Sequence, residues 1–241
     1  MKVLFQKFLN LILPPRCPYC GEIVCLPDAL CDDCFNKIEF ISAPYCHICG
    51  APFENEKDAN ISRVCADCAT HKKITRFNRS AVIYDDFFKS GLHRFKFHDQ
   101  IFFSKLYAKW LKTGGEDIFK NGVDLIVPVP LSYQRLFKRR YNQSALLAKE
   151  LSKLVCVPVD LNCLKKVKNT KPQSSLSEKQ RLKNLKNAFE IKDKFSVCNK
   201  RIVLVDDVMT TGATLFECAK VLIKAGAKSV DTLTIARTKK S

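Results

Sequence analysis

The segment Val203–Thr214, VLVDDVMTTGAT, places two adjacent acids beside a run of small hydroxyl residues. Paired carboxylates suit the vicinal hydroxyls of a sugar. The first turn of a helix has unpaired N–H groups and a positive dipole end, which suit a phosphate, and a glycine there permits close approach. The segment therefore predicts a pocket for a ribose that carries a 5′-phosphate. The alternative is an ordinary helix start, in which the acids and threonines only satisfy backbone N–H groups.

The elements around this segment predict an α/β domain. Strands are expected at residues 80–86, 123–131, 158–161, 201–207 and 229–237, and helical stretches at 87–115, 142–155 and 213–227. Apolar strands joined by helices predict a mostly parallel sheet covered on both faces, with ligands at the carboxyl ends of its strands. Asp206 and Asp207 fall at such an end. The segment has neither Gly-Lys-Ser/Thr nor Gly-x-Gly-x-x-Gly, so it is neither a Walker loop nor a dinucleotide fingerprint.

A second chemistry is indicated by cysteines, because eight of the thirteen form four Cys-x-x-Cys pairs before residue 70. The pairs are Cys17/Cys20, Cys31/Cys34, Cys46/Cys49 and Cys65/Cys68. This spacing brings two thiolates to one tetrahedral zinc ion, and two pairs complete a site. Sequential use of the pairs gives two zinc ribbons, whereas alternate use gives a cross-braced unit. The repeated starts CPYCG and CHICG favour sequential use. Redox dithiols and disulfides are less favoured, and a reducing, cytoplasmic location is expected.

The cysteine pairs before residue 70 and the strand–helix pattern that begins at Asn78 divide the chain into two expected domains, 1–70 and 78–241. The net charge is +17, and residues 131–200 alone hold 17 Lys/Arg against 5 Asp/Glu. Such an excess attracts phosphate or nucleic acid, although a merely solvated basic face is the commoner case. Residues 1–13, MKVLFQKFLNLIL, are expected to form an amphipathic helix that packs on a domain, with a membrane-surface role as the alternative. No apolar run is long enough for a membrane span.

Three blocks of the sequence resemble known families. The segment VLVDDVMTTGAT resembles the phosphoribosyl-pyrophosphate signature of type I phosphoribosyltransferases. DLIVPVPLSYQRLFKRRYNQSALLAKELS and KNTKPQSSLSEKQRLKNLKNAF resemble segments of the ComF family, which comprises competence-associated, phosphoribosyltransferase-like proteins and includes GntX-type members. The four cysteine pairs resemble that family's amino-terminal double zinc ribbon. The resemblance implies a type I phosphoribosyltransferase-like sheet preceded by a small zinc-ribbon module.

The resemblance also implies roles for individual residues. Asp206 and Asp207 would bind the ribose hydroxyls, and the phosphate would lie on Thr210, Thr211, Gly212, Ala213 and Thr214. Pro128 and Val129 belong to the turn that replaces the pyrophosphate loop, and Lys171 and Gln173 to a flap above it. Arg139, Asn142 and Gln143 stand in an Arg-Gly-aromatic-Asn-Gln motif. Arg140 occupies its glycine position, so we expect the backbone there to depart from a conformation that needs glycine.

The implied ligand is phosphoribosyl pyrophosphate with Mg²⁺. Loss of pyrophosphate from C1 would be helped by Mg²⁺ and by Arg139, Arg140 and Lys171, with the acids holding the ribose. None of these residues is an evident base for an incoming nucleophile. Only TKKS follows the last strand, so a hood over the acceptor is expected from residues 78–122, from the segment after Val159, or from the zinc module.

Two functions follow from the resemblance. One is an enzyme that transfers phosphoribose to an unidentified acceptor in natural competence, DNA uptake and transformation. The other is a phosphoribosyl-pyrophosphate-sensing or single-stranded-DNA-binding scaffold without turnover. Cations near Phe137 and Tyr141 in residues 131–200 suit single-stranded DNA. Proteins of the DNA-uptake machinery are the further expected partners.

Overall fold

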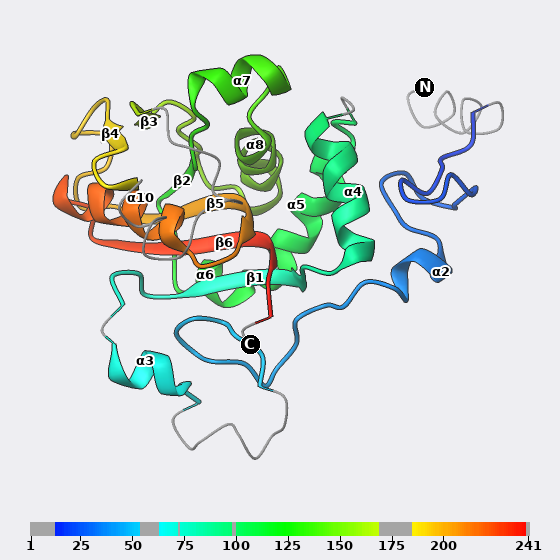
Figure 1. Ribbon diagram of the computed structural model, residues 1–241, viewed down its shortest axis with the longest axis horizontal. Helices are drawn as coiled ribbons and strands as arrows, with labels where there is room; N and C mark the ends of the chain where they lie inside the picture. The colour runs from blue at the N-terminus through cyan, green and yellow to red at the C-terminus, as the bar shows by residue number, and fades with distance from the viewer. Residues whose placement is uncertain (1–12, 54–62, 72, 98–99, 169–184, 240–241) are drawn as a thin grey trace.

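The computed structural model describes residues 13–53, 63–71, 73–97, 100–168 and 185–239 of the 241-residue chain. A central sheet flanked by helices forms the larger part, and two cysteine-bearing segments lie outside it (Figure 1). Of the amphipathic helix predicted at residues 1–13, residues 1–12 lie outside the described residues. Among the helices that are described, we find none with the length and hydropathy that a membrane crossing requires.

Four parallel strands form the central sheet, in the order β1-β6-β5-β2. They are β1 (Asn78–Ile83), β2 (Leu125–Pro128), β5 (Arg201–Met209) and β6 (Ser229–Arg237). The parallel sheet predicted from the apolar runs is confirmed. The strand expected at residues 158–161 forms only one bridge, Ile126 with Val159, because Pro158 has no N–H to donate to a longer ladder.

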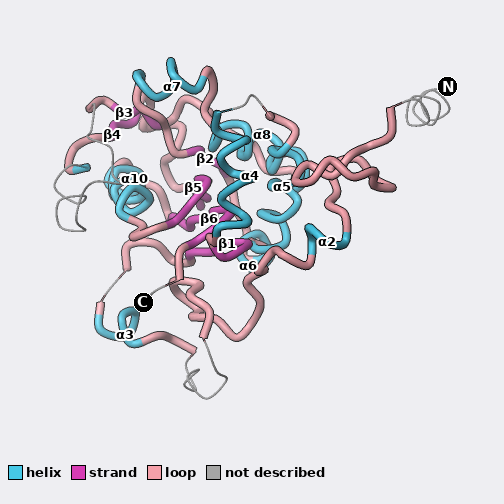
Figure 2. Tube along the Cα trace, turned by 45° about the vertical axis from the view of Figure 1, so that its right-hand side comes forward, coloured by secondary structure: helices cyan, strands magenta, loops and turns pink. Residues whose placement is uncertain are grey.

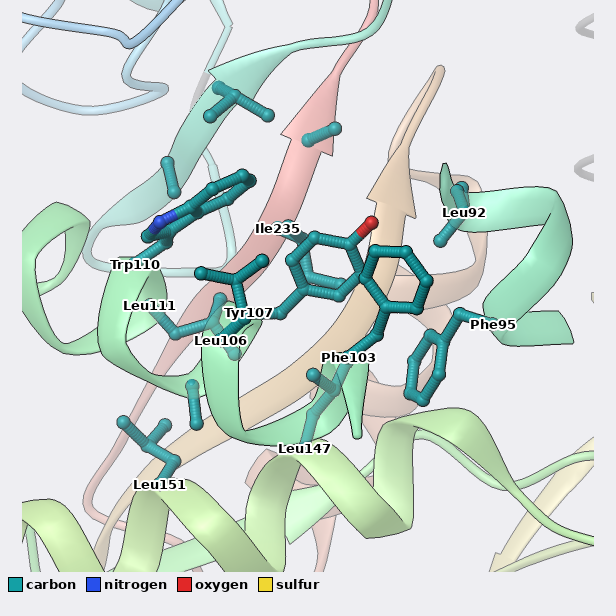
Figure 3. Close-up of a cluster of buried hydrophobic side chains, with 14 of the residues drawn as sticks. Leu92, Phe95, Phe103, Leu106, Tyr107, Trp110, Leu111, Leu147, Leu151 and Ile235 are labelled. Carbon is teal, nitrogen blue, oxygen red and sulfur yellow. The ribbon is translucent and has the colours of Figure 1, made fainter. Parts of the chain in front are cut away.

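Both faces of the sheet are covered. Val203 and Val205 of β5 point into a cluster with α5 (Phe103–Gly114) and α8 (Gln143–Val155). Ile202 and Leu204 point into a second cluster with α10 (Ala213–Lys224). The alternation follows from the two-residue period of a strand. Figure 3 shows the first cluster, in which aromatic and aliphatic side chains of α4, α5 and α8 surround Tyr107 beside Ile235 of β6.

The helical stretch expected at residues 87–115 is two helices, α4 (Asp86–Phe97) and α5. A single straight helix of that length would extend roughly 43 Å, longer than the sheet it must cover. With the break, both apolar faces enter one core. Phe88 and Phe95 of α4 lie with ring centroids 5.6 and 5.7 Å from that of Tyr107 of α5.

Several short elements were not predicted. They are α6 (Glu116–Lys120), α7 (Tyr133–Arg139), and the antiparallel pair β3 (Leu164–Lys166) and β4 (Phe189–Ile191). Strands of three residues are too short to show an alternating pattern, and α7 leaves its aromatic residues exposed instead of on an apolar face.

The two cysteine segments dock at different places on the sheet domain. The first ribbon (residues 13–36, with α2, Asp32–Phe35) lies beside α4 and α5, whereas the second ribbon (residues 44–53 and 63–71, with α3, Ala66–Thr70) lies next to β1 (Figures 1 and 2). The chain between them crosses the outer edge of β1, where Ile41 N–H donates to Ala81 and Ile83 N–H donates to Glu39. This contact covers part of an otherwise open sheet edge.

Candidate functional site

A pocket of about 290 Å³ opens at the carboxyl edge of the sheet. Its walls come from the ends of β2 and β5, the starts of α8 and α10, the last turn of α4, α7 and strand β3. It brings together Asp206, Asp207, Val129, Gln143 and the phosphate-loop residues Thr210, Gly212, Ala213 and Thr214, whereas the predicted site residues Thr211 and Pro128 do not line it. The position is where a parallel sheet is expected to bind its ligand.

The acid pair lies inside β5, which continues through it to Met209. Asp206 Oδ1 accepts hydrogen bonds from Ser144 Oγ at 2.7 Å and from the Asp207 N–H at 2.9 Å. Asp207 forms an ion pair with Lys96 of α4. Burial, reinforced by repulsion from Asp207, raises the pKa of Asp206 to about 7. The pair therefore carries less than its full charge near neutral pH until an added ligand or cation compensates it.

The threonine loop joins β5 to α10. Gly212 is the N-cap of α10 and has φ +76°, in the left-handed region that glycine favours. A Cβ built at Gly212 would lie 2.7 Å from Phe216 Cε2. The glycine is thus needed both for the turn and for the packing beneath it. The first-turn N–H groups of this twelve-residue helix face the same pocket as the acids.

The start of α8 connects three walls of the pocket. Asn142 is the N-cap, and its Oδ1 accepts from the Ser144 N–H at 3.1 Å. Its Nδ2 donates to the Val129 carbonyl, 3.1 Å away in the proline turn. Gln143 is buried, donates from Nε2 to the Lys96 carbonyl at 3.4 Å and accepts from Arg139 Nη1 at 3.2 Å. Asn142 and Gln143 therefore hold the turn, α4 and α7 against each other.

Arg140 does not alter the backbone as expected. Its φ is +64° and its ψ is −22°, so the arginine adopts the left-handed conformation that a glycine would favour at the end of α7. An L-residue pays about 1–2 kcal/mol for this conformation, which the surrounding contacts must offset. The expectation of a departure at this position was wrong, because the α7–α8 connection requires the turn whichever residue occupies it.

Two lysines of the pocket were not predicted. Lys96 reaches Asp207 from the last turn of α4, and Lys166 of β3 lines the pocket with its ammonium 5.5 Å from the Phe189 ring centroid. Burial lowers the pKa of Lys166 to about 8. In the sequence the signal was slight: Lys96 stands between Phe95 and Phe97 in an apolar stretch, which indicates a shielded cation but not its partner.

The remaining predicted positions fall into three groups. Arg139 lines the pocket with its guanidinium 5.1 Å from the Phe97 ring centroid. Lys171 and Gln173 lie outside the described residues. Tyr141 donates its hydroxyl to the Phe95 carbonyl at 2.7 Å and is half-buried, so it is not the exposed stacking residue that was expected. The exposed aromatic residues of this region are Tyr133 and Phe137 on α7.

Residues 78–122 and the segment after Val159 both contribute to the pocket walls, through Tyr84 and Lys96 and through Lys166. Among the described parts of the chain, no residue of the zinc module lines it. Of the three sources considered for a hood, these two therefore supply walls of the pocket.

The eight paired cysteines form two clusters of four thiols. Cys17, Cys20, Cys31 and Cys34 make one and Cys46, Cys49, Cys65 and Cys68 the other, with all Sγ atoms of a cluster within 4.8 Å of one another. Pairing is therefore sequential. The Sγ atoms of Cys20 and Cys31 are 3.5 Å apart and those of Cys49 and Cys65 3.7 Å, close to the roughly 3.8 Å edge of a zinc–sulfur tetrahedron. The donor sets fit two structural zinc ions.

The comparisons with known proteins agree with both halves of this description. Residues 8–69 match the double zinc ribbon domain family, and residues 142–241 match the phosphoribosyl transferase domain family. Competence protein F of Haemophilus influenzae is 34% identical over 232 residues, which cover 92% of this chain and 96% of that protein.

Two further relatives share the similarity. Competence protein ComFC of Bacillus subtilis is 31% identical over 219 residues, covering 88% of this chain and 85% of that protein. The DNA utilization protein YhgH of Escherichia coli is 39% identical over 115 residues, or 48% of this chain and 50% of that protein. A double zinc ribbon, a phosphoribosyltransferase domain and this full-length similarity together establish that the chain belongs to the ComF family.

Proposed function

We propose that the pocket binds phosphoribosyl pyrophosphate with Mg²⁺ and that the protein uses this ligand in natural competence. The observation that carries the proposal is the meeting of two unlike features in one pocket. Asp206 and Asp207 offer carboxylate acceptors for a diol, and the Gly212 turn at the start of α10 offers N–H donors for a phosphate. A ribose 5-phosphate carries both a diol and a phosphate in one small molecule.

The charges of the pocket favour a ligand with more than one phosphate. Four cations, Lys96, Arg135, Arg139 and Lys166, line the same volume as the two acids. A single phosphate on the threonine loop would leave several of these cations without an anion to pair with. A pyrophosphate at C1 would supply a second anionic group for them. The walls that hold the cations come from α4, α7 and β3, which surround the acid pair.

In the proposed reaction the chain's residues bind and orient the ribose. The acids accept the ribose hydroxyls, and Arg139 is held by Gln143 and Phe97 in a position to meet the negative charge that develops on departing pyrophosphate. Mg²⁺ would neutralise part of the pyrophosphate charge. Whether an acceptor takes the phosphoribose is a separate part of the proposal, and the unassigned nucleophile makes transfer the step to test.

Isothermal titration of the purified protein with phosphoribosyl pyrophosphate and Mg²⁺ tests the ligand. We expect saturable binding that the double change Asp206→Ala and Asp207→Ala weakens at least 100-fold. Asp193→Ala, an exposed acid in the loop after β4, is the matched control and should bind like the wild type. Absence of binding by the wild type would reject the ligand. Transfer is then tested by incubation of labelled ligand with a cell extract and a search for label on a new species.

A second candidate function is binding of single-stranded DNA. Tyr133 and Phe137 lie four residues apart on one face of α7 and are 85% and 90% exposed. In the sequence their neighbours include Arg135, Arg139 and Arg140, which belong to the basic residues 131–200. Exposed rings next to cations suit stacked bases and backbone phosphates. The names of the relatives, two competence proteins and a DNA utilization protein, favour a role near DNA.

A fluorescence titration with a single-stranded oligonucleotide tests this second candidate. Replacing Tyr133 and Phe137 by alanine should weaken binding about tenfold or more, at about 1–3 kcal/mol for each stacked base. Phe195→Ala is the matched control, because Phe195 is an equally exposed ring (91%) in the loop after β4. Affinity should fall steeply between low and moderate salt. Equal losses in the α7 and Phe195 variants, or affinity independent of salt, would contradict a stacking surface on α7.

A further inference from the structure

Lys96 forms an ion pair with one of the two carboxylates that the proposed ligand needs. Its ammonium pairs with Asp207 Oδ2, and both side chains are largely shielded from solvent, with 18% and 15% exposed. Asp206 has a different kind of partner, the neutral hydroxyl of Ser144. In the structure, therefore, one acid is held by a cation and its neighbour by hydroxyl and amide donors.

Ribose hydroxyls that approach Asp207 compete with this ammonium. A diol is neutral, so a diol that displaces Lys96 leaves a shielded cation without its counterion, which is strongly unfavourable. The exchange becomes favourable only when the same ligand supplies an anion for Lys96. In the proposed complex the 5′-phosphate accepts from the N–H groups of the threonine loop, so it is not available to pair with Lys96.

The surroundings of Lys96 indicate where that anion would lie. The Lys96 carbonyl accepts from Gln143, and the adjacent Asn142 donates to Val129 in the proline turn. The end of α4, the start of α8 and the turn between β2 and α7 are thus held in contact through two neighbouring residues. A lysine ammonium sits on a flexible four-carbon stem with three rotatable donors, so it can move between two anions of one pocket while its backbone stays fixed.

We propose that Lys96 is a specificity-determining residue that moves from Asp207 to a pyrophosphate at C1, so that the pocket prefers phosphoribosyl pyrophosphate to ribose 5-phosphate. This inference rests on the proposed function, since it assumes that the acid pair binds the ribose. It adds that the pocket discriminates against a sugar phosphate without pyrophosphate by means of the Lys96–Asp207 ion pair. Only a ligand with a pyrophosphate can displace the Lys96 ammonium from Asp207 and also supply a new anion for it.

The test is a comparison of two ligands on one substitution. Wild type, Lys96→Met and Lys96→Arg are titrated with phosphoribosyl pyrophosphate plus Mg²⁺, with ribose 5-phosphate, and with inorganic pyrophosphate plus Mg²⁺. In Lys96→Met we expect affinity for phosphoribosyl pyrophosphate and for pyrophosphate to fall at least tenfold. Affinity for ribose 5-phosphate should stay equal or rise about two- to fivefold, because its competitor for Asp207 is gone. Lys96→Arg should keep the wild-type preference in part.

Lys89→Met is the matched control, because it removes a lysine of the same helix whose ammonium lies near Asp86 at the surface. It should change neither affinity. If Lys96→Met is too unstable to titrate, Lys96→Gln replaces it as the neutral variant. Equal weakening of both sugar ligands would mean that Lys96 only maintains the pocket, and no change would mean that it does not contact the ligand; either result overturns the inference. A wild type that binds no phosphoribosyl pyrophosphate overturns the proposed function as well.

Discussion

The two zinc ribbons share the motif of two Cys-x-x-Cys pairs, with 10 residues between the pairs in the first ribbon and 15 in the second, and they are attached to the sheet domain in different ways. The first ribbon inserts an aromatic side chain: Tyr19 is buried, stacks on Phe87 at 4.9 Å between centroids and places its hydroxyl 3.0 Å from that of Tyr107. The second ribbon is attached by buried arginines. Arg79 of β1 donates to the His47 carbonyl and Arg237 of β6 to the Cys49 carbonyl.

The carbonyl at one equivalent position accepts from an arginine in both ribbons. Pro18 and His47 hold this position, directly after the first cysteine of each ribbon. The Pro18 carbonyl accepts from Arg94 of α4, and the His47 carbonyl accepts from Arg79 of β1. A zinc ion with four thiolates carries a net charge of about −2, so a cation beside it is favourable. Both cysteine sites therefore favour a nearby cationic donor. The element that supplies this donor differs, because α4 packs against the first ribbon and β1 against the second.

The largest expected difference concerns the cysteines themselves. Cys46 is fully buried, and its Sγ accepts from the N–H groups of Cys49 and Cys65, whereas Cys20 is exposed. Cys46→Ser should lower stability by about 4 kcal/mol or more and prevent recovery of folded protein, while Cys20→Ser should lose one zinc and leave the sheet domain folded. Zinc content by mass spectrometry and thermal unfolding measure both. Similar losses in the two variants would mean that the ribbons are equally important for folding.

The arginines give the next largest difference. Arg79→Met removes a buried cation that also pairs with Asp117 at 2.6 Å, and should cost about 3 kcal/mol. Arg94→Met removes a half-buried donor and should cost about 1 kcal/mol. Chemical denaturation of the zinc-loaded variants measures the two losses. Lysine at each position is the control for charge alone, and a larger loss for Arg94→Met would reverse the assignment of the polar attachment to the second ribbon.

Asp206 supplies a comparison outside both ribbons, because it is a buried carboxyl group to which we assign a ligand-binding role in the proposed function. Its pKa is raised from an ordinary value near 4 to about 7, so the folded state binds the extra proton and loses stability as pH rises through that interval. Asp206→Asn should therefore stabilise the protein by about 1–2 kcal/mol at pH 8 and by less at pH 5. Melting temperatures of both proteins at each pH test this. A gain of the same size at both values would exclude a titrating carboxylate as its cause.

The smallest expected difference links the first ribbon to the pocket. Arg94 of α4 donates to the Tyr19 carbonyl, so the first ribbon supports α4. The last turn of α4 carries Lys96. Loss of zinc from the first ribbon in Cys20→Ser should weaken binding of phosphoribosyl pyrophosphate about threefold, because α4 loses part of its support. Arg79→Met, on the opposite side, should leave that affinity unchanged. Titration of the folded variants measures both, and an equal effect of the two would contradict a connection specific to α4.

Sequence patterns were sufficient for much of the fold. The parallel sheet, α8 and α10 appear at the expected places because long apolar runs have an unambiguous period. The break between α4 and α5 was missed, since both helices continue one amphipathic pattern. The β3–β4 pair was missed because three residues show no period and the partner strand is distant in the chain.

The candidate site divides in the same manner. The acid–threonine segment and the four cysteine pairs are local: their functional atoms lie within a few residues, so spacing alone predicts that they act together. This much the sequence determined by itself, including two zinc clusters and a ligand with a sugar and a phosphate as the expectation for the pocket. Arg140 shows the limit of such reasoning, because the residue type suggested a changed turn that the neighbouring elements do not permit.

Only the tertiary structure decided which side chains complete the pocket. Ser144 reaches Asp206 across 62 positions of sequence, and Lys96 reaches Asp207 from α4, which packs in the same core cluster as α8. The sequential pairing of the cysteines and the separate attachment of each ribbon were decided there too. The physical reason is that an ion pair or hydrogen bond depends on where whole elements pack, and packing is set by the shared core of the sheet and not by any local pattern.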